Sequence, residues 1–506
     1  MSPITPAAGV VLAAGPGSTQ LLVVRRSERL RFFGGYYAFP GGKVDATDAE
    51  KESSGKPDDA RVRRIAAVRE LFEETGVLLA RRADGSFPAA GPELDELRRG
   101  LMEERLRFAE ILGKLGVTVR DEDLIPLGEV TTPEFVPVRF GTLFFLGFLP
   151  AGQRVDIWPG ELDQGIWTKP GDILEAWQRG DCLIAPPTVM MLETLRGRPI
   201  EEAPALLGPI YQSLAGGAIH PIYFAPDVRM IPLRTESLPP TNFTNAYFVG
   251  RGPLYLIDPG TTEREEQSRL FEVLDASRNG ERRLAAVILT HQHPDHVGAA
   301  NACAERYKVP IWAHRLTAEA LQGKIAIDRH LDEGDRLALG KTADGRPWEL
   351  QVLHTPGHAA GHLCFFEPRL RLLFTGDMVS TLSSVVIGPP DGDLAAYLES
   401  LRRLRSLPTR LLFPGHGNAS SRPQEVIDEY LAHRAKREEM LLLALSEKPR
   451  TIEDLLPELY KGTPPNLMRF AEMQLSAGLQ KLEREGRAAS AEENGKVGWR
   501  LVRPRS

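Results

Sequence analysis

The apolar positions of this 506-residue chain recur with two different spacings, which predict strands and helices in alternation. Short continuous apolar runs are typical of buried β-strands, and they occur at 21–24, 247–249, 254–257 and 285–289. Apolar side chains three and four residues apart, typical of a helix with one buried face, occur at 65–72 and 263–274. Short strands that alternate with helices favour α/β domains.

A break in this pattern at 207–218 separates two α/β regions. The stretches Leu-Gly-Pro-Ile and Ala-Gly-Gly-Ala interrupt the periodicity there, and a new strand-like run begins at Ile222. A length of 506 residues suggests roughly three domains at about 150 residues each. The sequence therefore predicts a first domain at 1–207 and a second domain at 219–430.

The last part of the chain has a different pattern, three helices followed by a hairpin. A charged amphipathic helix is expected from Tyr430 to Ser446, a second helix starts after the capping residue Thr451, and a third covers 465–485. Two β-like runs on either side of Asn494-Gly495 indicate a hairpin. This order predicts a small winged-helix domain at 431–506.

Composition and charge are those of a soluble globular protein. The chain has 42% apolar and 26% charged residues and a formal net charge of −6, too mild to indicate a membrane or nucleic acid as a general partner. No stretch approaches the roughly 18 apolar residues of a membrane span, and the apolar start at 1–14 lacks the basic residues of a signal peptide and predicts a first hairpin. The cysteines Cys182, Cys303 and Cys364 show no CxxC spacing, so neither disulfides nor a cysteine zinc site is indicated. We expect a cytoplasmic protein.

Histidines are confined to the later part of the chain, at or beyond His220, so the two α/β regions must use different chemistry. The segment His291-Gln292-His293-Pro294-Asp295-His296 follows a buried strand-like run and offers imidazole and carboxylate ligands that suit zinc, although other transition metals also accept them. Three further candidates each follow a strand-like run. The complete set is His291, His293, Asp295, His296, His358, Asp377 and His416. Seven ligands are enough for two metal ions.

The order of these motifs, HxHxDH, PGH, GD and PGH, resembles the metallo-β-lactamase superfamily over residues 222–434. The resemblance implies an αβ/βα sandwich with two Zn²⁺ ions and a hydroxide held between them. By the same resemblance, His291, His293 and His358 bind one metal, Asp295, His296 and His416 bind the other, and Asp377 bridges. Asp295 is also a catalytic candidate, because it can handle the proton.

The remaining histidines are interpreted more plainly. His314, His330 and His433 are expected at the surface or behind the ligands, and His354 and His362 either orient His358 or pack in the core.

The substrate of this second region stays open between two classes. Residues 463–467 and 479–486 resemble the C-terminal winged helix of the β-lactamase-like protein 2 family, which implies cleavage of single-stranded RNA. Related polyketide thioesterases and glyoxalase II cut thioesters, whereas β-lactam cleavage is less favoured. Basic residues of the winged helix are Arg434, Lys436, Arg437, Arg469, Lys481, Arg484 and Arg487. Because acids are almost as frequent there, a wall of the active-site cleft or a homodimer contact is favoured over nucleic-acid binding.

The first region carries a carboxylate motif instead. Helical spacing brings Glu70, Glu73 and Glu74 together after Arg69, and their like charges would repel unless a cation such as Mg²⁺ lies among them. With Phe39-Pro40-Gly41-Gly42 upstream, the stretch resembles the Nudix box, Gx5Ex7REUxEExGU. It departs in having Asp48 for the first Glu, and twenty residues instead of seven before Arg69. The excess is expected to form a surface loop.

The Nudix resemblance implies an α/β/α sandwich with Mg²⁺ or Mn²⁺ held by Glu73 and Glu74, with Glu70 beside them as a metal and catalytic candidate. Arg69, the other catalytic candidate, would hold the loop. Residues 22–42, which precede the box, resemble the coenzyme A diphosphatase signature. The long insertion and residues 186–195 resemble Nudix-type-19 acyl-CoA diphosphatases. The expected substrate-binding residues are Arg26, Arg31, Gly41 and Gly42, with the arginines facing phosphate.

These resemblances together predict a bifunctional metal-dependent hydrolase. The first half would split a nucleoside diphosphate linkage, most simply in CoA or acyl-CoA, and the second would hydrolyse single-stranded RNA or a thioester. The alternative is that the first half only binds a ligand or RNA and the second alone is an enzyme, a glyoxalase II-like thioesterase. The physiological substrates, the metals, the oligomeric state and any coupling between the sites stay open.

Overall fold

The computed structural model describes residues 3–30, 33–49, 60–134, 136, 138–217, 220–240, 242–277, 282–342, 345–493 and 496–502. The chain divides into two compact units, Met1–Arg229 and Met230–Ser506, and each is described by itself. No helix in the described ranges combines the length and the apolar character needed to cross a membrane.

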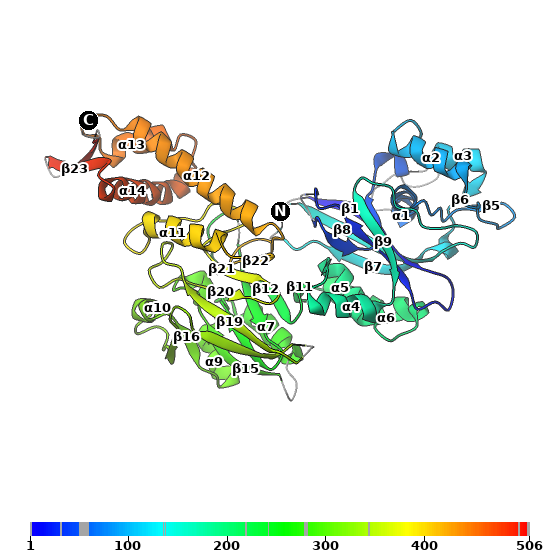
Figure 1. The fold of residues 1–506 in the computed structure, drawn as a ribbon, viewed down its shortest axis with the longest axis horizontal. Helices are drawn as coiled ribbons and strands as arrows, with labels where there is room; N and C mark the ends of the chain where they lie inside the picture. Colours follow the sequence, from blue (N-terminus) through cyan, green and yellow to red (C-terminus); the bar gives the residue numbers. More distant parts are fainter. Residues whose placement is uncertain are drawn as a thin grey trace. The chain divides into compact units, whose positions relative to one another are not determined.

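The first unit is built on one mixed sheet with the strand order β10-β3-β2-β1-β8-β7, to which β4 and β9 add beside β1 and β2 (Figure 1). The strands are β1 (Ile4–Ala13), β2 (Leu21–Arg26), β3 (Tyr36–Ala38), β4 (Gly41–Lys43), β7 (Ile125–Thr131), β8 (Arg139–Phe148), β9 (Leu162–Thr168) and β10 (Leu183–Ile184). A small hairpin pairs β5 (Arg81–Arg82) with β6 (Val117–Thr118). The antiparallel pairing of β1 with β2 agrees with the expected first hairpin.

Helices cover both faces of this sheet, because successive residues of its central strands point to opposite sides. Val10 and Leu12 pack with one helix group and Val11 and Ala13 with the other. The first group is α1 (Ala60–Thr75), α2 (Pro92–Met102) and α3 (Phe108–Leu115), and the second is α4 (Pro170–Arg179), α5 (Pro186–Leu195) and α6 (Ala203–Ala215). The expected α/β/α sandwich is present.

Helix α6 differs from the sequence expectation. The predicted break at 207–218 begins inside this helix, and the unit continues to Arg229 through strand β11 (Ile222–Ala225). Leu207 and Tyr211 are buried in the core, so packing outweighs the helix-breaking tendency of Gly208 and Pro209.

The second unit contains two sheets, with the orders β12-β13-β14-β15-β16-β17 and β18-β19-β20-β21-β22. The first consists of β12 (Val228–Arg234), β13 (Phe243–Val249), β14 (Pro253–Ile257), β15 (Arg283–Ile288), β16 (Ile311–Ala313) and β17 (Arg329–His330). The second consists of β18 (Arg336–Lys341), β19 (Pro347–His354), β20 (Leu363–Glu367), β21 (Leu372–Gly376) and β22 (Leu411–Pro414). Tyr247 of β13 contacts Phe374 and Phe413, at ring-centroid distances of 5.2 and 5.6 Å, so the two sheets face each other.

Helices lie on the outer faces of these sheets and complete an αβ/βα sandwich (Figure 1). They are α7 (Arg264–Ser277), α9 (Ala300–Tyr307), α10 (Arg315–Ala320) and α11 (Leu394–Arg405), while the short helix α8 (Pro294–Val297) belongs to the segment between β15 and α9. Tyr397 and Leu401 of α11 pack with Leu373 of β21 and Leu412 of β22.

The C-terminal part forms the expected three helices and hairpin, with α12 (Pro423–Ala444), α13 (Ile452–Leu459), α14 (Met468–Arg484), β23 (Ala488–Glu493) and β24 (Lys496–Leu501). The predicted hairpin turn, Asn494-Gly495, lies outside the described residues. Helix α12 begins before Tyr430, so the predicted boundary at 430/431 falls within it. Its first half contributes Ile427 to the sandwich core and its second half contributes Leu441 to the winged-helix core.

Candidate metal centre and carboxylate site

The candidate metal ligands of the second unit all follow strands on loops. Strand β15 ends at Ile288, and the next loop with the short helix α8 carries the HxHxDH segment 291–296. His358 follows β19, Asp377 directly follows β21, and His416 follows β22. The structure brings all seven predicted ligands to the same end of the sandwich, in two adjoining groups.

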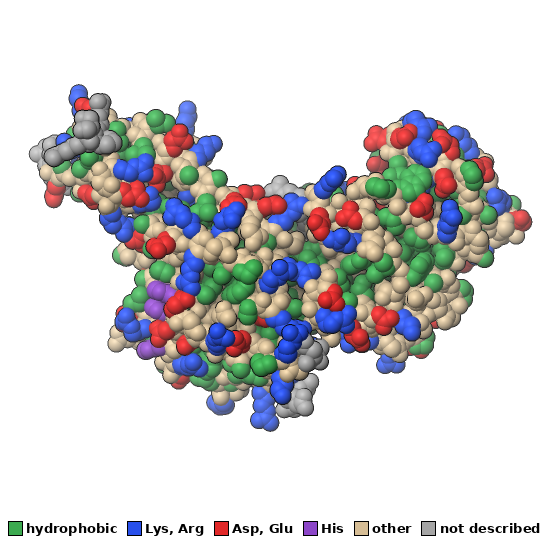
Figure 2. All heavy atoms as spheres, in the orientation of Figure 1, with side chains coloured by type: hydrophobic (Ala, Val, Ile, Leu, Met, Phe, Trp, Pro, Cys, Tyr) green, Lys and Arg blue, Asp and Glu red, His purple; other side chains and the backbone are tan. Residues whose placement is uncertain are grey.

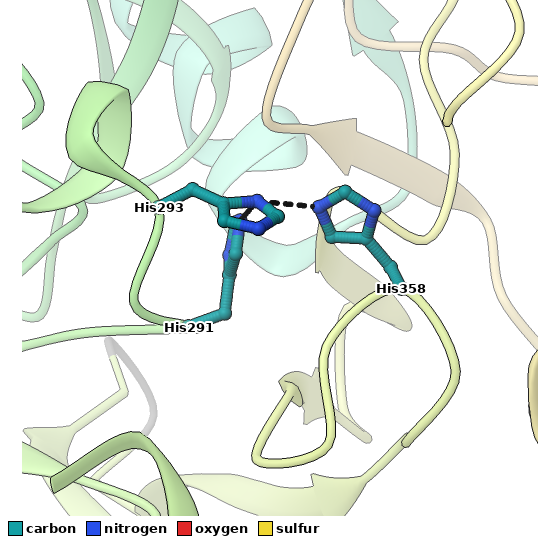
Figure 3. A group of neighbouring side chains, drawn as sticks. All are labelled: His291, His293 and His358. Carbon is teal, nitrogen blue, oxygen red and sulfur yellow. Dashed lines mark hydrogen bonds between the residues drawn. The ribbon is translucent and has the colours of Figure 1, made fainter. Parts of the chain in front are cut away.

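The first group consists of three imidazoles whose nitrogens converge (Figure 3). His293 Nδ1 lies 3.0 Å from His291 Nε2 and 2.9 Å from His358 Nε2. Burial and the neighbouring imidazoles hold the pKa of His291 well below its usual value, and burial lowers the pKa of His358 to about 4. Neutral imidazoles are the form that binds a metal ion.

The outer nitrogen of each of these histidines faces an oxygen. His291 Nδ1 lies 2.8 Å from Thr290 Oγ1, His358 Nδ1 lies 2.9 Å from the carbonyl oxygen of Val386, and His293 Nε2 lies 3.7 Å from Asp391 Oδ2. Such contacts orient metal-binding imidazoles and fix their tautomers.

The second group consists of His296, His416 and Asp295 around the carboxylate of Asp377. Asp377 Oδ1 lies 3.3 Å from His296 Nε2 and 3.4 Å from His416 Nε2, while its Oδ2 lies 3.7 Å from His358 in the first group. Asp377 thus presents one oxygen to each group. His296 Nε2 and Asp377 Oδ1 are buried without a hydrogen-bond partner among the described residues, so a cation here would satisfy both. The donor set therefore fits a two-metal centre.

The charges of this group also favour a bound metal ion. Burial lowers the pKa of His416, but the carboxylates of Asp377 and Asp295 together outweigh burial and raise that pKa to about 10. Burial raises the pKa of Asp377, but His416 and His296 hold it well below its usual value. The group therefore holds negative carboxylates that attract positive charge, and a metal ion would take the place of the histidine protons.

Asp258 was not anticipated from the sequence. It accepts hydrogen bonds from Thr290 N and Oγ1, at 2.8 and 2.6 Å, and lies 2.8 Å from His296 Nδ1. It therefore supports residues of both groups. The sequence did contain a hint of this role, because Asp258 directly follows the apolar run 254–257, just as the candidate ligands follow strand-like runs.

Of the other histidines, His362 supports a candidate ligand. His362 Nε2 accepts a hydrogen bond from the backbone N–H of Asp377, at 3.2 Å, so it supports Asp377 rather than His358. His354 lies 3.0 Å from the carbonyl oxygen of Ala360 and stacks on His314 at 4.2 Å. His330 and His433 are exposed.

The carboxylate site of the first unit lies on α1. Arg69 donates to both oxygens of the buried Asp48, at 2.7 and 3.0 Å, and also to Glu70 and Glu73, at 3.0 and 3.2 Å. Asp48, which stands in place of the glutamate of the box, thus fixes Arg69, and Arg69 in turn holds two of the candidate ligands.

Gly41 and Gly42 of β4 lie against the carboxylates of Glu74 and Glu70. Glu74 accepts a hydrogen bond of 2.9 Å from Gly41 N–H, and the Glu70 carboxylate fills the space that a side chain at Gly42 would need. Burial raises the pKa of Glu70 to about 7 and that of Glu74 to about 8. A cation among these carboxylates would offset the cost of burying their charge.

The structure does not gather Glu70, Glu73 and Glu74 as tightly as it gathers the histidines. Within the described ranges, the close groups of three possible metal ligands all belong to the second unit. The buried Nε of Arg26 has no hydrogen-bond partner among the described residues, and the charge of Arg26 lowers the pKa of Glu74, so Arg26 lies near the carboxylates. Arg31 lies outside the described residues.

Glu161 is a further acid at this site, and no motif in the sequence pointed to it. Its charge raises the pKa of both Glu73 and Glu74, and its carbonyl oxygen accepts a hydrogen bond of 2.8 Å from Ser27. It lies directly before β9.

The fold and the histidine–aspartate cluster define a metal-binding hydrolase. The metallo-beta-lactamase superfamily profile matches residues 239–416, the NUDT19 Nudix domain matches 49–195, and the beta-lactamase associated winged helix domain matches 451–499. The chain is thus a fusion of a NUDT19-type Nudix domain with a metallo-β-lactamase domain, similar to beta-lactamase-like protein 2, and a C-terminal winged helix.

Three relatives illustrate this composition. A beta-lactamase-like protein 2 homolog of Caenorhabditis elegans is 28% identical over 48% of this chain and 79% of its own length. An atrochrysone carboxyl ACP thioesterase of Aspergillus fumigatus is 27% identical over 51% of this chain and 81% of its own length. A putative nudix hydrolase 7 of Caenorhabditis elegans is 30% identical over 37% of this chain and 59% of its own length.

Proposed function

We propose that this hydrolase acts on CoA derivatives at two sites, splitting the diphosphate at the Nudix site and the thioester at the metallo-β-lactamase site. The single observation that carries the second activity is the pair of adjoining ligand groups that share Asp377. Two Zn²⁺ ions held there would supply a hydroxide nucleophile for the carbonyl carbon and stabilise the oxyanion that forms on the carbonyl oxygen. The attack forms a C–O bond, and the C–S bond then breaks, releasing the carboxylic acid and the thiol.

Residues of the chain account for the remaining requirements of this reaction. Asp258, Thr290 and the carbonyl of Val386 orient the imidazoles. Asp295 has a side chain that is 16% exposed and lies 3.4 Å from His416 Nε2, so it can pass a proton toward the leaving thiolate.

The winged helix favours a thioester over RNA as substrate. Five of the seven basic side chains named in the sequence analysis are already engaged within the second unit: Lys481 with Glu438 and Glu485, Arg487 with Glu438, Arg484 with Asp393, Arg434 with Gln474, and Arg437 with Leu459. On the face shown in Figure 2, acidic and basic side chains are interleaved over this module. Such a surface offers little net charge for a polyanion. The thioesterase among the relatives points the same way.

The Nudix site suits diphosphate hydrolysis. Its buried carboxylates are ligands of the kind that Mg²⁺ or Mn²⁺ prefers, and the nearby Nε of Arg26, which has no partner in the part of the chain that the structure describes, suits a phosphate oxygen. The NUDT19 type of the domain supports CoA or acyl-CoA as substrate.

Two other functions each have one observation in their favour. The similarity to beta-lactamase-like protein 2, with its winged helix, supports cleavage of single-stranded RNA. The looser arrangement of Glu70, Glu73 and Glu74 supports a Nudix half that binds its ligand without cleaving it.

A parallel assay separates these functions. The purified protein is offered CoA, acyl-CoA, acyl-glutathione and single-stranded RNA, and is compared with Asp295→Ala and with Glu73→Gln/Glu74→Gln. We expect thioester cleavage to fall by about 100-fold or more only in Asp295→Ala, and Mg²⁺-dependent diphosphate cleavage to disappear only in the double variant. RNA cleavage without thioester cleavage would replace the proposal for the second site, and diphosphate turnover that survives the double variant would refute the first.

A further inference from the structure

The loop between β21 and α11 contacts both the metal centre and the winged helix. On one side, the carbonyl oxygen of Val386 lies 2.9 Å from His358 Nδ1, and Asp391 faces His293 Nε2 at 3.7 Å. The same Asp391 accepts hydrogen bonds from the side chain of Gln292 and from the backbone of Ala360. Residues 385–391 thus provide the outer contacts of two of the three histidines in the first group.

On its other side this loop is held by helix α12. Arg434 is 7% exposed and donates from Nη2 to the carbonyl oxygen of Val385, the residue next to Val386. Its Nη1 donates to Gln474 Oε1 of α14 at 2.6 Å, and its guanidinium lies 5.4 Å from the ring centroid of Tyr397. Arg434 therefore joins α12, α14 and α11 to the loop.

Helix α14 adds two contacts to the same loop. Met473 packs against Gly388 so closely that no side chain fits at that glycine. Arg484 pairs with Asp393, with Nη2 3.0 Å from Oδ1, and Asp393 caps α11. The winged-helix domain thus supports the loop at Val385, Gly388 and Asp393.

We propose that Arg434 is a positioning residue for the metal centre, and that the winged helix holds the loop whose Val386 carbonyl orients His358. Without the guanidinium, the Val385 carbonyl would lose a charge-assisted hydrogen bond in a buried place. The loop would then be free to shift, and His358 would lose the partner that fixes its ring. Loss of such a partner typically weakens metal binding by about 10-fold to 100-fold.

Arg437 provides a matched control, because it lies one turn further along α12 and its guanidinium also donates to a backbone carbonyl oxygen. It donates to the carbonyl oxygen of Leu459 at 3.0 Å and lies 4.1 Å from the ring centroid of Tyr460, both within the winged helix. Arg437→Met therefore removes an arginine of the same helix without touching the loop.

The test compares Arg434→Met, Arg434→Lys, Gln474→Leu and Arg437→Met in the full chain. Zinc content and the rate of zinc loss to a chelator are measured, together with the visible spectrum of the Co²⁺-loaded protein and the melting temperature. We expect Arg434→Met to lose one of two metal ions about 10-fold faster or more and to shift the Co²⁺ spectrum. Arg434→Lys should fall between it and the wild type, because lysine donates without the planar fork.

Unchanged metal loss and an unchanged Co²⁺ spectrum in Arg434→Met would overturn the proposal, as would an equal effect in Arg437→Met. If Arg434→Met does not fold, Gln474→Leu decides, since it frees Arg434 Nη1 without stranding a charge. Faster metal loss in Gln474→Leu at an unchanged melting temperature supports the positioning role, and wild-type metal loss contradicts it. Because these measurements use no substrate, they do not depend on the proposed activities.

Discussion

Asp258 supports both ligand groups of the metal centre. Its carboxylate accepts hydrogen bonds from the backbone N–H and the hydroxyl of Thr290, the residue before His291, and also faces Nδ1 of His296. Its backbone has φ of +51°, a left-handed conformation that asparagine and aspartate tolerate better than most residues. The position therefore demands both a carboxylate and a particular backbone.

Asp258→Asn should keep this backbone but lose the charge that attracts the His296 Nδ1 proton. We expect metal affinity to fall by about 10-fold to 100-fold, measured by competition with a chromophoric chelator. Asp275→Asn is the control, because Asp275 pairs with Arg306 at the surface. Equal affinities in the two variants would show that Asp258 does not support the centre.

Asp48 and Arg69 form the corresponding buried pair of the Nudix site. Asp48→Ala leaves the Arg69 guanidinium buried without its main partner, which should lower the free energy of unfolding by about 3 to 5 kcal/mol. Asp45→Ala, which removes only an exposed cap to Thr47, should cost about 1 kcal/mol. Chemical denaturation of both variants checks the difference, and similar losses would contradict it.

At the scale of elements, β4 and α1 build the Nudix site by close approach. The N–H of Gly41 binds Glu74, and Gly42 leaves room for the carboxylate of Glu70. A side chain at Gly41 would meet the backbone of Ala8 in β1, whereas one at Gly42 would meet only the movable end of Glu70. The two glycines therefore have different roles.

Gly42→Ala should preserve the fold but displace Glu70, lowering kcat/KM for Mg²⁺-dependent diphosphate hydrolysis by about 100-fold. Gly41→Ala should instead lower the melting temperature, because the backbone of β1 cannot move aside. Kinetics and thermal unfolding of both variants test this contrast. A Gly42→Ala enzyme with wild-type kcat/KM would mean that Glu70 needs no fixed place.

Elements could be read from periodicity, but their ends could not. The predicted helix at 430–446 is real, yet α12 begins at Pro423 because its first half packs on the sandwich and its second on the winged helix. Likewise α6 runs through Pro209 because Leu207 and Tyr211 are buried. The start of α12 and the continuation of α6 past Pro209 both depend on packing partners that are distant in the sequence.

At the scale of the whole molecule, the two sites use different ligand chemistry. The metallo-β-lactamase centre offers imidazole nitrogen and buried carboxylate, whereas the Nudix site offers only carboxylates among its candidate ligands. Nitrogen ligands favour zinc-like metals and oxygen ligands favour Mg²⁺.

A nitrogen chelator such as 1,10-phenanthroline in excess Mg²⁺ should therefore abolish thioester cleavage and leave diphosphate cleavage intact. Both activities are measured in the same sample, and re-addition of Zn²⁺ should restore the first. Parallel loss of both would show that the sites are coupled or share a metal requirement.

The sequence by itself determined the three-part composition, the order of the ligand motifs and the difference between the two sites, because motif spacing and periodicity are local properties. It also predicted His291, His293, Asp295, His296, His358, Asp377 and His416, which the structure gathers in two groups. Only the tertiary structure decided how these side chains are supported. The roles of Asp258, Glu161 and Arg434 arise from contacts between segments distant in sequence, and no local pattern records such contacts.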